Sequence, residues 1–234
     1  MCAIILSMSA ASIRARVRAE MVEEIKAAAR RHLASDGANL SLRAVARDLG
    51  MVSSALYRYF TSRDALLTAL IIDAYNALGT VVEAADAAVE RGDLLGRWLA
   101  ACHAVRDWAL ANPHEYALIY GSPVPGYQAP EDSVGPATRP TLVLARILSD
   151  GVAAGTLTLP DTTLPPAVQT DLDRLIAAAL PEMSAQVLAR GMAGWIQLFG
   201  AVSFELFGRF TNVIDDRAAF FDHQMRQTAA YIGL

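Results

Sequence analysis

The sequence predicts an all-α fold made of a small N-terminal unit and a larger C-terminal unit. Apolar residues recur at steps of three and four along most of the 234 residues, which is the period of helices with one buried face. No segment alternates apolar and polar residues as a half-buried strand would. Glycines, prolines and capping residues interrupt the pattern where helices of ordinary length should end. These observations favour packed helices over any sheet.

The N-terminal unit is expected to hold three helices followed by a long fourth. We expect these helices over residues 12–35, 42–49, 52–60 and 62–90. Asp36-Gly37 ends the first helix, and Ser41 is a natural N-cap for the second. Because a tight turn at Gly50 joins the second and third helices, the two form a helix-turn-helix. Its small core is predicted to consist of Leu42, Val45, Ala46, Leu49, Leu56 and Phe60.

The C-terminal unit is expected to be helical throughout. We expect its helices over residues 94–111, 114–120, 141–154, 167–180, 182–207 and 215–231. Two stretches between these helices, 121–140 and 155–166, contain several prolines and glycines and are predicted to be irregular. The chain therefore divides into a disordered leader at 1–11, a helix-turn-helix domain at 12–64 and a helical domain at 65–234.

The composition limits where the protein acts. Hydrophobic residues make up 54% of the chain, which calls for a large core or an extensive subunit interface. No uncharged apolar run approaches the ~20 residues that span a bilayer, so no membrane partner is expected. The leader has no basic residue before its apolar run and makes a poor signal peptide; Met1 and Met8 are both possible starts. Two cysteines, Cys2 and Cys102, argue against a disulfide framework, and a cytoplasmic protein is expected.

The charge is unevenly distributed between the two units. The whole chain carries a net charge of −4, which by itself speaks against a nucleic-acid partner. Residues 12–64, however, hold ten basic and six acidic side chains, a net charge of +4, whereas residues 65–234 hold ten basic and eighteen acidic ones, a net charge of −8. A basic unit joined to an acidic one is typical of a DNA-binding domain attached to a domain of another kind.

The third predicted helix carries the side chains that suit contacts with DNA. Ser53, Ser54, Tyr57, Arg58 and Tyr59 supply hydroxyl groups and a guanidinium for phosphate and base-edge contacts. Helix capping competes with phosphate binding as the role of the two serines. Packing in the core is the alternative for the two tyrosines, and plain solvation is the alternative for the arginine. The segment predicts a DNA-reading helix-turn-helix.

The stretch from Leu40 to Leu66 resembles the DNA-binding signature of the TetR (tetracycline repressor) family of bacterial transcription regulators. The matching residues are Leu40-Ser41, Val45-Ala46, Leu49-Gly50-Met51, Leu56-Tyr57-Arg58-Tyr59-Phe60, Ser62-Arg63 and Leu66. Two later stretches, NPHEYALIYGSPVPGY and GWIQLFGAVSFELFG, are similar to one subgroup of the family's C-terminal domains. The chain departs from the signature at Val52, where an N-cap serine is common, at Tyr59, where many members have histidine, and at Arg63, where lysine is usual.

The resemblance adds two residues to the predicted DNA contacts. Arg43, near the start of the second helix, is similar to a family position that contacts bases or phosphates. Arg63 keeps the positive charge of the usual lysine and permits bidentate phosphate binding. Arg14, Arg16 and Arg18 are expected to approach the DNA backbone, with a solvated basic face as the alternative.

The C-terminal unit contains aromatic and polar side chains that suit the lining of a ligand cavity. A mostly apolar cavity with a few polar groups is the usual site for a small molecule. The candidates for ligand contact are Trp98, His103, Trp108, Tyr116, Tyr120, Trp195 and Phe199. Because a helical unit of this size must bury aromatic residues anyway, ordinary core packing is the alternative for each of them.

The sequence offers no support for a catalytic or metal site. Cys102 and His103 are adjacent, so on a helix they point about 100° apart and cannot share a metal. Asp171 and Asp173 lack further acids and phosphate-binding glycines nearby, and favourable charge at a helix start explains them better. Nucleophile-elbow, P-loop and dinucleotide-binding motifs are absent from the sequence. We expect no catalytic residue, no metal and no cofactor.

The last two predicted helices have broad apolar faces that indicate a homodimer. The apolar residues are Val187, Leu188, Met192, Trp195, Phe199, Val202, Leu206, Phe220, Phe221, Met225 and Tyr231. Faces wider than one core contact suggest a four-helix bundle formed between two subunits. A two-fold dimer would also present two recognition helices to half-sites about 34–36 Å apart.

The resemblance implies a dimeric regulator, most simply a repressor, that leaves a palindromic operator when a small apolar or aromatic ligand binds. The two ligands, DNA and effector, would then oppose each other through a coupling free energy of ~1–3 kcal/mol. An activator and a ligand-independent regulator remain alternatives within the same class. Outside that class stand a helical enzyme that uses the cavity and an interaction protein whose helix-turn-helix no longer binds DNA.

Overall fold

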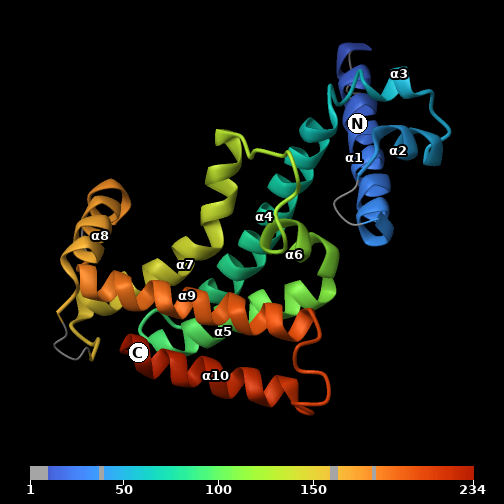
Figure 1. The fold of residues 1–234 in the computed structure, drawn as a ribbon. Helices are drawn as coiled ribbons and strands as arrows, with labels where there is room; N and C mark the ends of the chain where they lie inside the picture. Colours follow the sequence, from blue (N-terminus) through green and yellow to red (C-terminus); the bar gives the residue numbers. More distant parts are fainter. Residues whose placement is uncertain (1–9, 37–39, 159–162, 181–182) are drawn as a thin grey trace, which may run out of the picture. The chain divides into compact units, whose positions relative to one another are not determined.

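The computed structural model describes residues 10–36, 40–158, 163–180 and 183–234, which form helices and connecting segments without a strand among them (Figure 1). The helices are α1 (Ala10–Asp36), α2 (Leu42–Asp48), α3 (Ser53–Leu56), α4 (Arg63–Ala87), α5 (Leu94–Ala111), α6 (Pro113–Tyr120), α7 (Val134–Ala154), α8 (Pro166–Ala179), α9 (Ala185–Leu206) and α10 (Arg217–Ile232). The all-α prediction is confirmed. Of the predicted disordered leader at 1–11, residues 1–9 lie outside the described residues, whereas residues 10 and 11 begin α1, so the prediction is wrong there.

The chain divides into two units, and the N-terminal unit includes one segment from the middle of the chain. The head comprises the described residues up to Ile71 together with Ser122–Pro130, and the body comprises Ile72–Gly121 and Glu131–Leu234. Helix α4 supplies its first residues to the head and the remainder to the body. The sequence prediction divided the chain after residue 64 and assigned 122–130 to the C-terminal domain. The difference arises because Val124 is buried and the Tyr127 hydroxyl lies 2.9 Å from the Thr68 hydroxyl, within the head.

The head is built around a small apolar core. Helix α2 packs on α1 and α3, as a helix-turn-helix requires. The turn between α2 and α3 needs a left-handed residue, which Gly50 supplies with φ of 65°. The buried apolar residues described in the head are Ile25, Ala28, Ala29, Leu33, Leu40, Leu42, Val45, Ala46, Leu56, Phe60, Leu66, Leu67, Leu70, Ile71 and Val124. This list contains five of the six predicted core residues, whereas Leu49, the C-cap of α2, is only partly buried.

The third helix is shorter than the sequence predicted. A helix was expected over 52–60, but α3 ends at Leu56 and the chain continues to Phe60 through hydrogen-bonded turns. The amides of Arg58 and Tyr59 donate to the carbonyls of Ala55 and Leu56, three residues back, at 3.3 and 2.9 Å. Such bonds tighten the last turn of a helix and end its regular α geometry.

The body is organised around α5, α9 and α10, which lie side by side, with α7 packed against α5 and α9 (Figure 1). Trp98 and Tyr116 are among its largest fully buried side chains. The Trp98 Nε1 donates to the Met225 carbonyl at 3.0 Å, which ties α5 to α10. Side-chain oxygens of Ser184 and Asp216 cap the first turns of α9 and α10. The core of the larger unit therefore depends on pairing between its middle and last helices.

One predicted loop is wrong. Residues 121–140 were expected to be irregular, yet a 3₁₀ turn forms at Glu131–Ser133 and α7 begins at Val134. Pro136 lies in the first turn, where its missing amide proton has no intrahelical acceptor. Pro140 gives up one interior hydrogen bond, and the buried apolar face of the helix offsets that loss. The apolar residues of this face are Val143, Leu144, Ile147 and Leu148. Apart from α3 and the start of α7, the predicted helices agree with the structure to within three residues at each described end.

Two helices, α4 and α9, are long and apolar enough to cross a membrane if judged by length and composition alone. Core helices of globular proteins pass the same test, so the observation is weak. In α4, Leu66 and Leu67 are buried in the head, and Leu78 is buried in the body. In α9, Leu198 and Val202 belong to the body core. Burial of these side chains within the fold accounts for part of the hydropathy of each helix.

Candidate nucleic-acid interface and body cavity

The helix-turn-helix presents one polar, exposed face. Ser54, Tyr57 and Arg58 stand three and four residues apart, so they share one side of the α3 turn, and all three are exposed. Arg43 is exposed in the first turn of α2. The opposite side of α3 carries Leu56, which is fully buried. The segment thus separates a core-facing side from a side that is free to meet a polyanion.

The start of α3 lacks a side-chain cap. Val52 is the N-cap residue and forms no capping hydrogen bond. Ser53 does not replace it, because this serine is already the first helical residue and is partly buried. Without a capping oxygen, the first amides of the helix are left for an outside acceptor, and a DNA phosphate is one such acceptor. This position is where the sequence departs from the common family pattern.

Tyr59 is engaged by a residue from α1. The Arg18 guanidinium lies 5.0 Å from the centre of the Tyr59 ring, a cation–π distance. The same side chain donates to the Arg58 carbonyl at 3.0 Å. Arg18 therefore holds the turn after α3 in place from forty residues away in the sequence, and no spacing rule in the sequence reveals such a contact.

Arg63 is also engaged within the head. Its Nε donates to the Leu40 carbonyl at 3.1 Å, and its Nη1 lies 3.7 Å from the Asp64 carboxylate. The guanidinium joins the start of α4 to Leu40, the residue before the N-cap of α2. Phosphate binding by Arg63 remains a prediction, and the structure gives this side chain a structural role as well.

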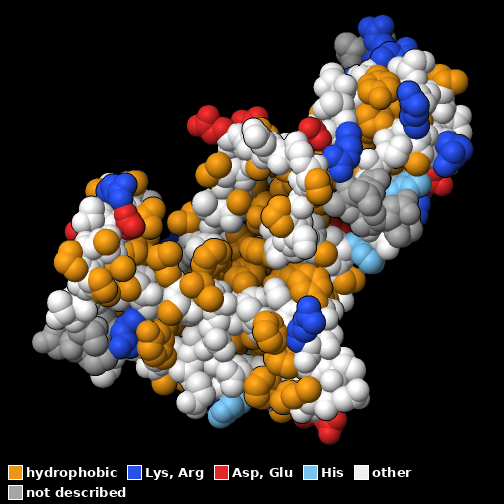
Figure 2. Space-filling view, in the orientation of Figure 1, with side chains coloured by type: hydrophobic (Ala, Val, Ile, Leu, Met, Phe, Trp, Pro, Cys, Tyr) orange, Lys and Arg blue, Asp and Glu red, His pale blue; other side chains and the backbone are white. Residues whose placement is uncertain are grey.

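The acidic residue of α2, Asp48, is paired. The Asp48 carboxylate accepts from Arg31 at 2.7 Å, and this hydrogen bond holds the pKa of Asp48 below its ordinary value. Figure 2 shows Lys and Arg side chains spread over the outer surface of the head. Because Asp48 is paired with Arg31, its charge opposes an approaching phosphate less than a lone carboxylate would.

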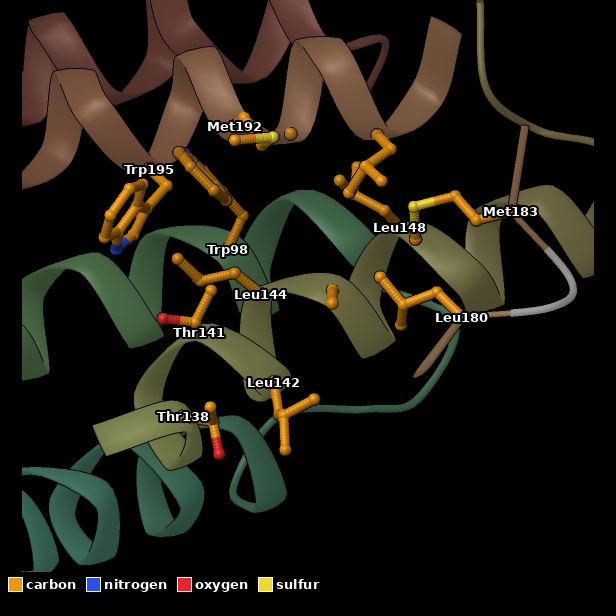
Figure 3. A pocket seen from close by; sticks show the side chains of 13 residues that line it. Trp98, Thr138, Thr141, Leu142, Leu144, Leu148, Leu180, Met183, Met192 and Trp195 are labelled. Atoms are coloured by element: carbon orange, nitrogen blue, oxygen red, sulfur yellow. The ribbon is translucent and has the colours of Figure 1, made fainter. Parts of the chain in front are cut away.

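The body contains an apolar cavity of about 150 Å³ (Figure 3). Residues from α5, α7, α9 and the connection before α9 line it. They are Trp98, Thr138, Thr141, Leu142, Leu144, Ala145, Leu148, Leu180, Met183, Leu188, Gly191, Met192 and Trp195. Of the seven side chains that the sequence suggested for ligand contact, Trp98 and Trp195 are at this cavity. None of the described residues that line it carries a charge.

Three of the other suggested residues form an aromatic cluster elsewhere in the body. The Tyr120 ring lies 4.2 Å from Phe199 and 5.2 Å from Tyr116, measured between ring centres. The Tyr116 hydroxyl donates to the Phe199 carbonyl at 3.1 Å and lies 2.8 Å from the Ser203 hydroxyl. Burial raises the pKa of Tyr116 to about 12, so its hydroxyl stays protonated at neutral pH.

The last two suggested residues lie apart from the cavity as well. Trp108 is buried in the body core. His103 is partly exposed, its Nε2 lies 3.1 Å from the Asp222 carboxylate, and its ring packs edge-on against Phe221. His103 thus links α5 to α10. Neither residue lines the cavity described above, and ligand contact by Trp108 and His103 remains a prediction.

The sequence reasoning missed the largest part of the cavity wall. Six of the lining residues come from α7 and two from the connection before α9. The search favoured aromatic residues and treated the beginning of α7 as a loop. Leucines at helical spacing, such as Leu144 and Leu148, were the available signal, but their pattern marks a buried face and does not show where packing is incomplete.

Comparisons with known proteins identify the class. Residues 25–70 match the family model described as bacterial regulatory proteins, tetR family. Residues 98–228, more than half of the chain, match the model described as tetracyclin repressor-like, C-terminal domain. With a helix-turn-helix that exposes a polar face, these matches define a DNA-binding transcription regulator. The chain belongs to the TetR family of bacterial regulators.

Relatives and solved structures agree with that assignment. The chain is 38% identical over 222 residues to the HTH-type transcriptional regulator Rv1816 of Mycobacterium tuberculosis, covering 94% of this chain and 93% of the relative. The same values hold for regulator Mb1846 of Mycobacterium bovis. The crystal structure of the regulatory protein SCO4313 aligns with a TM-score of 0.74 and 36% identity, covering 92% of this chain and 98% of that one. These relatives are regulators, a class distinct from enzymes.

Proposed function

We propose that this chain is a dimeric, cytoplasmic repressor that binds a palindromic operator and leaves it when a small apolar ligand occupies the body. The observation that carries the proposal is the exposed face of Ser54, Tyr57 and Arg58 on a helix-turn-helix of this family. Tyr57 and Arg58 reach outward, where base edges and phosphates would lie.

The DNA-binding part is tested by a mobility-shift assay on the region upstream of the protein's own gene. A retarded band is expected at low salt, and its affinity should fall steeply as salt rises, because phosphate contacts release counterions. A fragment of the same length from inside the coding region serves as the control. Equal retardation of both fragments at all salt concentrations, or of neither, would contradict specific operator binding.

Dimerisation is supported by apolar side chains that the isolated chain leaves in solvent. Ile196 and Phe204 on α9 are 62% and 55% exposed, and Tyr231 on α10 is also exposed. An exposed apolar face of this kind marks an interaction surface. Light scattering should give twice the mass of one chain for the wild type and the mass of one chain for Ile196→Asp. Leu110→Asp, on α5, is the matched control and should remain dimeric.

The regulatory part rests on helix α4, which belongs to both units. A ligand that favours one arrangement of the body would shift the population of head arrangements through this shared helix. The expected coupling is ~1–3 kcal/mol, or about a 5- to 150-fold change in DNA affinity. Deleting the gene should raise transcription from the operator if the protein represses, whereas a fall would identify an activator.

A further inference from the structure

We propose that Arg139 transmits the state of the body cavity to helix α4, because it joins the cavity wall on α7 to the part of α4 that lies in the body. The inference rests on the proposed function, since it names the residue through which a ligand in the cavity would reach the helix that both units share. Arg139 is hydrogen-bonded to α4, and its neighbours in the chain line the cavity.

The guanidinium of Arg139 is fully hydrogen-bonded to α4. Its Nη1 donates to the carbonyl and the side-chain oxygen of Asn76, at 3.1 and 2.9 Å. Its Nη2 donates to the Thr80 hydroxyl at 3.2 Å, and its Nη2 and Nε donate to the two Glu83 carboxylate oxygens at 2.6 and 2.9 Å. A guanidinium has five N–H groups, so each of them has an acceptor here. The three acceptor residues stand four and three positions apart and therefore share one face of α4.

Helix α7 approaches α4 closely at the same place. A Cβ atom at Gly79 would lie 2.8 Å from the Cβ of Arg139, whereas carbon atoms attract best at about 3.5–4.0 Å. Glycine is therefore required for the approach. Because the contact involves the Cβ of Arg139, which is fixed to the backbone, a displacement of this turn of α7 acts on α4 with little slack.

The turn of α7 that carries Arg139 also belongs to the cavity wall. Thr138, Thr141 and Leu142 line the cavity from this end of α7 (Figure 3). Pro140 lies inside the helix and has no amide proton to donate. The first turns of α7 are thus held to the rest of the helix by one hydrogen bond fewer than in a regular helix. We expect this part of the wall to yield when the cavity is filled.

A second link between α7 and α4 is more firmly held. Arg97 of α5 donates to Asp86 of α4 at 2.7 Å and to Asp150 of α7 at 2.8 Å. Its side chain is 1% exposed, whereas that of Arg139 is 29% exposed. Breaking a buried pair costs more than breaking a partly exposed one. A displacement of α7 should therefore act at Arg139 while Arg97 holds the ends of both helices in place.

An introduced side chain can serve as an occupant of the cavity. A Cβ atom at Gly191 of α9 would lie 2.6 Å from the Cδ1 of Leu148 on α7, so Gly191→Val crowds the cavity from the α9 side. Hydrogen exchange of the α4 amides 76–87 is then measured on the full chain without DNA. Gly191→Val should make this exchange about three- to tenfold faster, the worth of a partly exposed hydrogen-bonded pair. Arg139→Ala should have a similar effect, and adding the valine to Arg139→Ala should change nothing further.

Two matched variants separate transmission from stability. Arg146 is an exposed arginine of α7 that acts on Glu83 through its charge and forms no hydrogen bond with another described residue. In Arg146→Ala the valine should keep its full effect. Arg139→Lys keeps the charge but cannot make the five bonds, so it should remove most of the effect of the valine. Thermal melting shows that each variant is folded.

The outcomes distinguish this inference from the proposed function. Unchanged α4 exchange in Gly191→Val, an effect of the valine that persists in Arg139→Ala or in full in Arg139→Lys, or its loss in Arg146→Ala would overturn the inference. In the mobility-shift assay, Gly191→Val should weaken operator binding about fivefold or more only where Arg139 is present. A retarded wild-type band with additive exchange effects removes only this inference. Non-additive exchange without any retarded band supports the link to α4 and removes the regulator.

Discussion

Two arginines of the head and two of the body differ in their surroundings. In the head, Arg43 and Arg58 are exposed, and no ion pair joins either side chain to another described residue. In the body, Arg97 is fully buried between Asp86 and Asp150, and Arg106 forms a bidentate pair with Glu205 at 2.7 and 2.6 Å. An unpaired exposed guanidinium is available to a phosphate, whereas a buried, paired one holds helices together. Arg43 and Arg58 are therefore free for the DNA contacts that we propose, whereas Arg97 and Arg106 hold helices of the body together, as Arg63 joins two segments of the head.

The largest expected effect is a loss of unfolding free energy when Arg97 of the body is replaced. Arg97→Ala leaves two carboxylates without their shared partner, and loss of one member of a buried pair costs about 3–5 kcal/mol of unfolding free energy. Urea denaturation followed by circular dichroism measures it. Arg91→Ala is the matched control, because Arg91 also contacts Asp150 but its side chain is 68% exposed, so its loss should cost ~0–1 kcal/mol. Equal losses for both variants would contradict an architectural role specific to Arg97.

The next effect is confined to the head. Leu56 is fully buried beneath the exposed face of α3, and Leu56→Ala should destabilise this unit by about 2–5 kcal/mol. Hydrogen exchange should become faster for the amides of α1 and α2 and stay unchanged for α5 and α10. Val52→Ala, at an exposed position four residues earlier, should leave hydrogen exchange unchanged in the head and in the body. Faster exchange throughout the body would mean that the two units do not unfold separately.

A smaller effect is expected for DNA affinity on loss of an exposed arginine. Arg58→Ala should weaken operator binding about tenfold at moderate salt and reduce the slope of log K against log salt by about 2 for a dimer, one phosphate from each subunit. Arg209→Ala removes an exposed arginine of the body and should change neither quantity. An unchanged slope with weakened binding would instead assign Arg58 to a contact with a base.

The smallest effect concerns a surface pair of the body and its pH dependence. Arg139 donates to both oxygens of Glu83, at 2.9 and 2.6 Å, which holds the pKa of Glu83 below its ordinary value of 4.5. A folded pKa below the unfolded one means that the pair stabilises the fold above about pH 4.5 and that this stability is lost as pH falls through the folded pKa. The stability difference between wild type and Glu83→Gln should therefore be present at pH 7 and shrink below pH 4.5. A difference that stays constant down to pH 3 would exclude the pair as its cause.

Local signals explain which parts of the fold the sequence could predict. Helix α5 was predicted to the residue, Leu94 to Ala111, because Asp93 caps its first turn and Asn112-Pro113 ends it. The first turns of α7 were predicted as a loop because of their prolines. Tertiary packing of the apolar face stabilises the helix there, and local signals do not show this packing. The third helix was predicted to extend to residue 60 because the hydrogen-bonded turns after Leu56 keep the side-chain spacing of a helix.

The residues of the candidate sites could be predicted only where their side-chain chemistry and their helical spacing give the same answer. Exposure of Ser54, Tyr57 and Arg58 follows from helical periodicity around Leu56. The engagement of Tyr59 by Arg18 depends on tertiary contact and leaves no trace in the local sequence. In the body, the aromatic residues of the sequence led to the prediction of Trp98 and Trp195. The cavity beside them arises from incomplete packing among leucines, and the residue types in a sequence do not show where packing is incomplete.

The segment Ser122–Pro130 makes the head discontinuous in the chain. Val124 and Tyr127 complete the head although about fifty residues of the body separate them from α4's first turns. A fragment cut after Ile71 therefore lacks part of its own domain. Chimaeras that exchange DNA specificity between relatives should carry this segment along with the N-terminal helices, since the modular boundary follows the packing and not the order of residues.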